Sequence, residues 1–268
     1  MNKIFHLLLI FCLTANFARA EQVDTIEVFS NAMRINIKNT IVLPVDYDSQ
    51  KNLPVVYLLH GHGGNHKQWL AIKPNLPELA TRYQMIIVCP SGKNSWYWDS
   101  PVDPTMRYET YISKELPDYM DKNYKTRKDK SGRAITGLSM GGHGGLFLGI
   151  RHQDVFGACG SISGGVDIRP FSKNWDMEKS LGAYSANPKR WDNHTVITQV
   201  HLIKPGLSII IDCGIDDFFY EVNEKLHREL LNRKIKHDFI SRPGVHNNSY
   251  WNNAIEYQLL FFSQAFHD

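Results

Sequence analysis

One short stretch, G-L-S-M-G-G at residues 137–142, constrains the fold more than any other part of the chain. It matches the pattern G-x-S-x-G and lies between an apolar run at 133–136 and a helix-like apolar run that continues to Ile150. This arrangement is typical of a nucleophile elbow, a turn that lifts a serine hydroxyl above the edge of a sheet. Gly137 and Gly141 would relieve crowding on either side of Ser139 because they lack Cβ. A serine hydroxyl needs a base, so the elbow predicts a histidine, an orienting acid and backbone donors for an oxyanion.

The N-terminus has the pattern of an export signal. Lys3 precedes an apolar run at 4–13, and Ala18-Arg19-Ala20 is a small-x-small cleavage pattern. The run is too short for a membrane-spanning helix. A lipoprotein signal with Cys12 as the lipidated residue is the alternative, but Phe11 occupies a position where a small residue is expected. We therefore expect residues 1–20 to be removed and the protein to be exported, to the periplasm or beyond.

Composition excludes several other classes of protein. The chain has 268 residues, 43% hydrophobic and 21% charged, which is typical of a soluble globular protein. Of 30 basic residues, loss of Lys3 and Arg19 leaves 28 against 27 acidic, a net charge of about +1. This balance predicts no nucleic-acid partner, and the basic run at 122–133 is interpreted as a solvated loop. Three cysteines remain after cleavage, with no C-x-x-C or H-E-x-x-H, so we expect neither a catalytic thiol, a metal nor a cofactor.

Apolar runs alternate with helical patterns along the rest of the chain. Residues 25–43 predict two or three antiparallel strands, and later runs predict strands at 54–59, 85–88, 133–136, 156–163, 207–211 and 237–240. The runs at 54–59, 85–88 and 207–211 have the continuous apolar pattern of buried strands. Helices are expected at 69–83 with breaks at Pro74 and Pro77, at 108–120 with a kink or early end at Pro117, after Ser139, and at 223–235 and 249–266. This alternation predicts an α/β fold with a mainly parallel central sheet and helices on both faces. We expect a single domain over 21–268, with residues 164–205 as an insertion that shapes a pocket at the carboxyl edge of the sheet.

The partners of Ser139 can be sought by their order along the chain. In hydrolases built on this elbow the acid follows the serine and the histidine follows the acid. The run I-I-I-D-C-G-I-D-D at 209–217 offers Asp212, Asp216 and Asp217; Asp212 still belongs to the strand, and physics alone barely separates the other two. His246 follows the last expected strand and precedes the closing helix, as a catalytic histidine should. The other histidines of the mature chain precede the elbow or lie where a structural or solvated imidazole is the better interpretation.

Backbone donors for an oxyanion are predicted at two places. One is the N–H of Met140, directly after the nucleophile. The other should come from the glycine-rich loop H-G-H-G-G at 60–64, where His62 is the preferred donor and Gly61 or Gly63 are alternatives.

Taken together, these motifs resemble the esterase D-like family of α/β-hydrolases. The matching segments are L-L-H-G-H-G-G-N at 58–65, S-W-Y-W-D-S-P at 95–101, Y-E-T-Y-I-S-K-E-L-P at 108–117, G-L-S-M-G-G at 137–142, D-C-G-I-D-D-F-F-Y at 212–220 and P-G-V-H at 243–246. The resemblance implies an α/β-hydrolase fold and, through its C-G-x-x-D-F pattern, an acid at Asp217. It also implies His246 as the base and His62 as an oxyanion donor. Many relatives have an aromatic residue two positions after the histidine, where this chain has Asn248.

The expected activity is cleavage of acyl esters through an acyl-enzyme on Ser139. The family includes feruloyl, acetylxylan and tributyrin esterases, S-formylglutathione hydrolases and mycolyltransferases. Export counts against a glutathione ester, so acetyl or feruloyl esters of plant polysaccharide are the preferred substrates, small-molecule or oligosaccharide. Trp96, Tyr97 and Trp175 are candidate substrate contacts, because flat rings can stack on sugars or phenolic groups. Asp99, in the same loop as Trp96 and Tyr97, is a further candidate. General short-chain esterase activity, acyl transfer to a sugar and a non-enzymatic carbohydrate-binding module are the alternatives.

Overall fold

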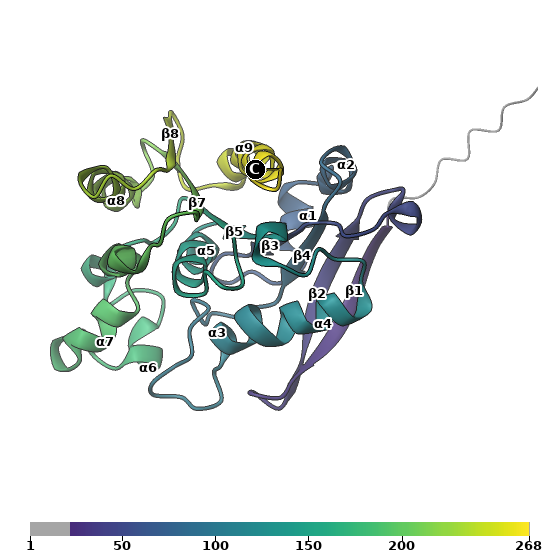
Figure 1. Ribbon diagram of the computed structural model, residues 1–268. Coiled ribbons are helices and arrows are strands. Elements are labelled where there is room, and N and C mark those ends of the chain that lie inside the picture. Colours follow the sequence, from purple (N-terminus) through teal and green to yellow (C-terminus); the bar gives the residue numbers. More distant parts are fainter. Residues whose placement is uncertain (1–21, 268) are drawn as a thin grey trace, which may run out of the picture.

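The computed structural model describes residues 22–267, so the expected signal segment at 1–20 lies outside the described residues. One eight-stranded sheet forms the centre, with strand order β1-β2-β4-β3-β5-β6-β7-β8 (Figure 1). The strands are β1 Gln22–Ser30, β2 Ile35–Leu43, β3 Val55–Leu59, β4 Ile86–Pro90, β5 Arg133–Gly137, β6 Ala158–Ile162, β7 Ser208–Gly214 and β8 Asp238–Arg242. β1 and β2 are antiparallel, β2 runs antiparallel to β4, and every pairing from β4 to β8 is parallel. The predicted mainly parallel sheet is therefore confirmed.

Helices cover both faces of this sheet. They are α1 Gln68–Ile72, α2 Leu76–Arg82, α3 Tyr108–Thr110, α4 Leu116–Asn123, α5 Met140–Arg151, α6 Met177–Leu181, α7 Pro188–Asn193, α8 Tyr220–Asn232 and α9 Asn248–Ala265. Figure 1 shows α1, α2 and α9 on one side of the sheet and α4 and α5 on the other. Successive residues of a strand point to opposite faces, and β3 follows this rule. Val56 and Leu58 join the core beneath α1, α2 and α9, whereas Val55, Tyr57 and Leu59 join the core beneath α4, α5 and α8.

Three prolines act differently from one another. Pro74 separates α1 from α2, as predicted, but Pro77 lies in the first turn of α2, where a missing N–H costs nothing. Pro117 does not end its helix, but the helix that contains it is irregular. A π-helical turn at Tyr111–Glu115 joins α3 to α4 directly before it. This wider turn accommodates a ring that would otherwise clash with the carbonyl group four residues earlier.

The parallel strands direct four loops to one edge of the sheet. The loops that follow β3, β5, β7 and β8 leave the carboxyl ends of their strands and carry His62, Ser139, Asp217 and His246, respectively. Residues 164–205 join β6 to β7 and contain α6, α7 and short 3₁₀ turns. Ligands of open α/β sheets bind at this carboxyl edge.

Candidate active site

The turn that carries Ser139 is strained in the way a nucleophile elbow requires. Ser139 has φ 56° and ψ −116°, a conformation that residues with a Cβ rarely adopt. Its N–H donates to the carbonyl of Ile162 (2.9 Å), and α5 starts at the next residue. Such strain costs about 1–3 kcal/mol and persists only where the surrounding structure enforces it.

Two glycines allow the elbow to sit against the preceding strand. A Cβ on Gly137 would lie 2.4 Å from the carbonyl oxygen of Leu59, and a Cβ on Gly141 would lie at the same distance from that oxygen. The Gly141 Cβ would also lie 2.7 Å from the His60 carbonyl oxygen. Backbone atoms cannot move aside as a flexible side chain can, so both positions require glycine.

His246 lies between Ser139 and Asp217 and contacts both. Its Nε2 is 3.0 Å from the Ser139 Oγ, and its Nδ1 is 2.7 Å from the Asp217 Oδ2. Because an ionised carboxylate only accepts, the Nδ1–H donates to Asp217 and leaves Nε2 to accept the serine proton. The Asp217 side chain is fully buried and that of His246 is 16% exposed. Three side chains from three loops therefore form a continuous hydrogen-bonded chain that ends on the serine hydroxyl.

The structure separates the three candidate acids by their partners. Asp217 also accepts from the N–H of Phe219 (2.8 Å) through its second oxygen, which fixes the carboxylate. Asp216 is exposed, and its side chain takes no part in this chain of contacts. Asp212 is buried, but it accepts from Tyr250 Oη (2.5 Å) and from an Arg242 guanidinium nitrogen (2.8 Å) instead. Asp212 therefore joins β7 to β8 and α9 rather than to the histidine.

Two backbone N–H groups beside Ser139 are free to bind an oxyanion. Within residues 22–267, the N–H groups of His62 and Met140 donate to no protein acceptor. The neighbouring amides are occupied: Gly61 N–H donates to Gln68 Oε1 (2.8 Å), Gly63 N–H to Asn94 Oδ1 (2.7 Å) and Gly64 N–H to the Gly61 carbonyl (3.0 Å). A Cβ on Gly61 would lie 3.6 Å from the Ser139 Cβ, so this loop adjoins the nucleophile. Of the loop donors considered from the sequence, only His62 is left available.

The His62 imidazole connects the glycine-rich loop to the segment between β6 and β7. It lies beside the backbone of Trp175, and its Nε2 is buried without a partner. Burial lowers the pKa of His62 below its ordinary value, which keeps the ring neutral at pH 7. Trp175 and Asp176 both have positive φ, 52° and 55°, so the segment is also strained where it meets this loop.

The histidines set aside in the sequence as structural include two that are buried in the core. His60 has its Nδ1 2.7 Å from the Gly61 carbonyl and accepts from the Gly92 N–H (2.7 Å), and burial lowers its pKa to about 4. His143 has its Nδ1 2.9 Å from the Gly165 carbonyl and accepts from the Trp98 indole (2.8 Å), and burial lowers its pKa to about 3. Both rings are therefore neutral connectors between loops.

The expected aromatic contacts to substrate need correction. Trp96 is 2% exposed and Tyr97 is completely buried, so neither offers an open face for stacking. Tyr97 packs so closely against α5 that a Cβ on Gly144 would lie only 2.5 Å from its ring. The Tyr97 hydroxyl donates to the His60 carbonyl (3.0 Å). The prediction that these two rings bind substrate directly is therefore wrong.

Asp99 has a structural role of its own. Its carboxylate accepts from the N–H (3.0 Å) and the hydroxyl (2.5 Å) of Thr110, the last residue of α3. These two bonds hold α3 in place. Trp175, the fourth candidate, is partly exposed and lies in a cluster of aromatic rings that reaches the site.

Phe218 is the residue that the sequence analysis missed. It directly follows Asp217, is 53% exposed, and its ring centroid lies 4.3 Å from that of His246. On its other side it stacks with Trp175 at 6.0 Å and 24° between ring planes. The available signal was its position within D-D-F-F, directly after the candidate acid. Trp251 contacts the same imidazole edge-on at 4.9 Å.

The described residues offer no exposed thiol, metal-binding cluster or membrane-spanning helix. Cys89, Cys159 and Cys213 are free and buried, and burial raises the pKa of each thiol, to about 12 for Cys89. Residues 22–267 contain no group of three or more His, Cys, Asp or Glu side chains arranged to hold a metal ion. In the same range, no helix has both the length and the apolar character needed to cross a bilayer.

The sheet topology, the strained serine turn and the convergence of loops define an α/β-hydrolase. Comparison with known proteins adds the family: residues 30–262 match the esterase family described as "Putative esterase". The chain belongs to this family and is a carboxylic ester hydrolase.

Individual relatives agree with this assignment. The chain is 26% identical to an acetyl esterase of Caldicellulosiruptor saccharolyticus over 251 residues, which covers 86% of this chain and 94% of that protein. It is similar to the structure of a ferulic acid esterase, with TM-score 0.78, 27% identity and coverage of 92% and 98% of the two chains. A substrate-bound fluorophosphonate-binding serine hydrolase of Staphylococcus aureus has TM-score 0.80 at 20% identity, over 91% of this chain and 98% of that one. At that identity the likeness concerns the fold alone.

Proposed function

We propose that the protein cleaves acyl esters by a Ser-His-Asp mechanism. The observation that carries this proposal is the position of His246, within hydrogen-bond distance of both Ser139 Oγ (3.0 Å) and Asp217 Oδ2 (2.7 Å). His246 accepts the serine proton while Ser139 Oγ attacks the carbonyl carbon. Asp217 holds the imidazole in the required tautomer and stabilises the imidazolium that forms. The N–H groups of His62 and Met140 bind the developing oxyanion.

The second half of the reaction uses the same groups. His246 gives its proton to the leaving alcohol, and the acyl group stays on Ser139 as an ester. Water then attacks this ester while His246 takes its proton; His246 returns that proton to Ser139 Oγ as the acid product leaves. Every proton passes through Nε2 of one histidine, so the fixed Nδ1–Asp217 contact matters in both steps.

Replacement of the nucleophile tests the mechanism directly. Ser139→Ala should abolish hydrolysis of p-nitrophenyl acetate and labelling by a fluorophosphonate probe, with an unchanged melting temperature. Ser263→Ala is a suitable control, because its hydroxyl donates only to the Leu260 carbonyl within α9. Unchanged turnover in Ser139→Ala would refute the assignment, and absence of labelling in the wild type would favour a binding module.

The proposed natural substrates are acetyl or feruloyl esters of plant polysaccharide. Support comes from the acetyl esterase and ferulic acid esterase relatives and from the partly exposed rings of Trp175 and Phe218 beside the site. We further propose that residues 164–205 shape this pocket, because Trp175 belongs to that segment. Rates of release from acetylated xylan, methyl ferulate and tributyrin would separate the three activities. A preference for tributyrin would indicate a general short-chain esterase.

The protein is proposed to act outside the cytoplasm. This proposal is supported by the sequence pattern at 1–20, an apolar run that ends in Ala18-Arg19-Ala20. N-terminal sequencing of the protein from the periplasm or medium should begin at Glu21. Recovery of the intact chain from the cytosol alone would contradict it.

A further inference from the structure

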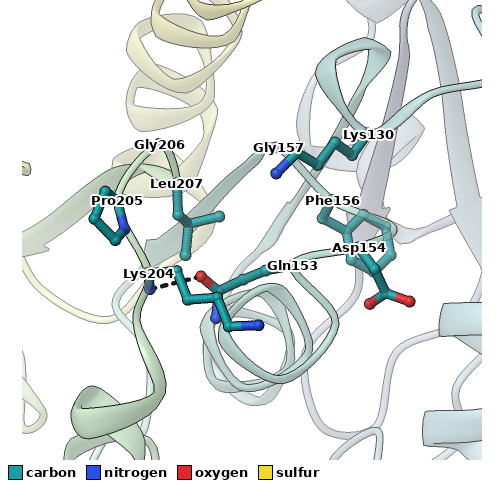
Figure 2. Close-up of a pocket in the computed structure, with 9 residues that line it drawn as sticks. All are labelled: Lys130, Gln153, Asp154, Phe156, Gly157, Lys204, Pro205, Gly206 and Leu207. Atoms are coloured by element: carbon teal, nitrogen blue, oxygen red, sulfur yellow. Dashed lines mark hydrogen bonds between the residues drawn. The ribbon is translucent and has the colours of Figure 1, made fainter.

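The edge of the sheet opposite the candidate active site has two neighbouring cavities. The first, about 250 Å³, lies among the loops that precede β5, β6 and β7, and Figure 2 shows the side chains that line it. The second, about 500 Å³, lies between the loop preceding β7 and the turn that joins α8 to β8. The two share residues 204–207 as a common wall. They therefore lie side by side along the amino-terminal edge of the parallel strands.

Among the charged side chains that line the two cavities, positive ones outnumber negative ones. The cations are Lys130 and Lys204 in the first, with Lys204, Arg233, Lys234 and Lys236 in the second. Asp154 is the one acid that lines the first cavity, and no acid lines the second. All five cations are exposed. We name this set of residues the basic edge.

Four of these cations have no ion-pair partner within residues 22–267. Arg233 is bound to Glu229 (2.6 Å), whereas the ammonium groups of Lys130, Lys204, Lys234 and Lys236 have neither an ion pair nor a hydrogen bond to other described residues. Like charges brought together on a surface repel one another, and an anion that binds between them removes that repulsion. The mature chain is otherwise almost neutral, so the basic edge is a local feature rather than a property of the whole surface.

Three of the six cations in the basic run at 122–133 are used by the fold itself. Lys125 donates to the Asp48 carbonyl (2.6 Å), Arg127 to the Phe266 carbonyl (2.7 Å), and Arg133 pairs with Asp121. Lys130 is different, because it extends from this run to the first cavity. The interpretation of the run as a merely solvated loop does not account for Lys130.

The wall between the cavities is held in place. The N–H of Lys204 donates to Gln153 Oε1 (2.8 Å), as Figure 2 shows, and Gln153 also donates to the carbonyls of Ile150 (2.7 Å) and Leu202 (2.8 Å). These bonds join the 204–207 loop to the end of α5. The backbone of this part of the basic edge is therefore held before any partner binds, which reduces the entropy lost on binding.

We propose that the basic edge binds an acidic polysaccharide, a chain of sugars that bears carboxylate groups. Lysine is a compact point charge, suited to single carboxylates spaced along a chain, whereas bidentate recognition of phosphate favours arginine. Pro205 and Leu207 line both cavities and offer apolar surface to sugar rings. Binding there would retain the enzyme on a polysaccharide and raise the local concentration of its ester groups.

Other anionic macromolecules fit the basic edge less well. Single-stranded nucleic acids require exposed aromatic rings for base stacking, and the one aromatic residue that lines either cavity, Phe156, is buried. Membrane-surface binding generally needs an amphipathic helix with apolar anchors, but the basic edge consists of loops. These two partners are alternatives that the experiment can detect.

Native gel electrophoresis in the presence of polysaccharide tests the proposal on the mature protein. The wild type should be retarded by polygalacturonate but not by neutral arabinoxylan, and added salt should weaken the retardation. The triple variant K204A/K234A/K236A should bind polygalacturonate about tenfold or more weakly. The control K67A/K114A/K189A removes the same charge from exposed lysines elsewhere and should bind like the wild type.

Several outcomes would overturn the proposal. These are equal retardation by the neutral polymer, unchanged binding in the basic-edge variant, equal loss in the control, or tighter binding to anionic phosphatidylserine vesicles or to DNA. Hydrolysis of p-nitrophenyl acetate gives a separate readout, because the basic edge lies opposite Ser139. Both triple variants should keep wild-type turnover. If the wild type binds polygalacturonate but cleaves no ester, the proposed function is refuted and the proposal of polysaccharide binding stands.

Discussion

Phe218 lies against the imidazole of His246, with ring centroids 4.3 Å apart and an angle of 40° between the ring planes. Trp251 contacts the same imidazole edge-on at 4.9 Å. Ring contacts of this kind contribute about 0.5–1.5 kcal/mol beyond burial. His246 is therefore positioned by two aromatic neighbours as well as by Asp217.

Truncation of Phe218 should weaken catalysis without removing it. If the contact holds the imidazole in its productive orientation, Phe218→Ala should lower kcat for p-nitrophenyl acetate by about 2- to 10-fold. Phe29→Ala is the matched control, because Phe29 is similarly exposed (47%) but lies on β1. Equal kcat values for the Phe218 variant and the wild type would show that Phe218 does not position the histidine.

Asp217 and its neighbour Asp216 should respond very differently to amide substitution. Asp217→Asn keeps the shape but favours the wrong imidazole tautomer, so kcat should fall about 10⁴-fold. Asp216→Asn changes an exposed carboxylate outside the hydrogen-bonded chain and should leave kcat nearly unchanged. Steady-state kinetics on both variants checks this, and similar losses in the two would contradict the choice of acid.

The glycine before the elbow should tolerate no side chain. Gly137→Ala would place a Cβ 2.4 Å from the Leu59 carbonyl oxygen, and the resulting backbone shift should cost more than about 2 kcal/mol of unfolding free energy. Gly206→Ala provides the comparison: its φ is +95°, but nothing lies within 4 Å of the added Cβ, so the cost should be only about 1–2 kcal/mol. Urea denaturation measures both, and a smaller loss at Gly137 would contradict the steric argument.

Glu109 should make the fold sensitive to acid. Burial alone would raise the pKa of Glu109, but hydrogen bonds and charges from His152 and Arg151 outweigh it and hold this pKa below its ordinary value. The stabilisation is therefore present above the unfolded-state pKa, about 4.3, and is lost as pH falls through the lower folded-state pKa.

Glu109→Gln is the variant that tests this linkage. At pH 7 it should lose about 1–3 kcal/mol of unfolding free energy, and the difference from wild type should shrink below about pH 4. Glu27→Gln, at an exposed and weakly paired carboxylate, should change little at either pH. Melting temperatures measured between pH 3 and 7 give the comparison, and a difference that does not depend on pH would exclude the linkage.

The central sheet and the three candidate catalytic residues could be predicted because each has a local signature. β3 and β4 are continuous apolar runs, Ser139 lies within a glycine pattern, and His246 stands out by its position between the last expected strand and the closing helix. The choice between Asp216 and Asp217 needed the family resemblance, since both follow the same strand. Coordinates separate them through burial and the Phe219 N–H.

The rings that surround the site could not be predicted in the same way. Whether an aromatic side chain is buried depends on which distant segment covers it. Tyr97 is buried because Gly144, on α5, leaves room for its ring. Phe218 is exposed because it follows the acid at the tip of a loop. Neither relationship has a periodic pattern, and Tyr97 and Gly144 lie far apart in the sequence.

The buried contacts of Asp212 have a mechanical consequence for the two loops above them. Arg242 and Tyr250 lie four residues before and four residues after His246, and both bind a carboxylate located five residues before Asp217. The segments that carry His246 and Asp217 are therefore both bonded through Asp212, beneath the candidate active site. Thermal motion in α9 or β8 would carry both loops together and preserve the distance between them while the whole assembly shifts.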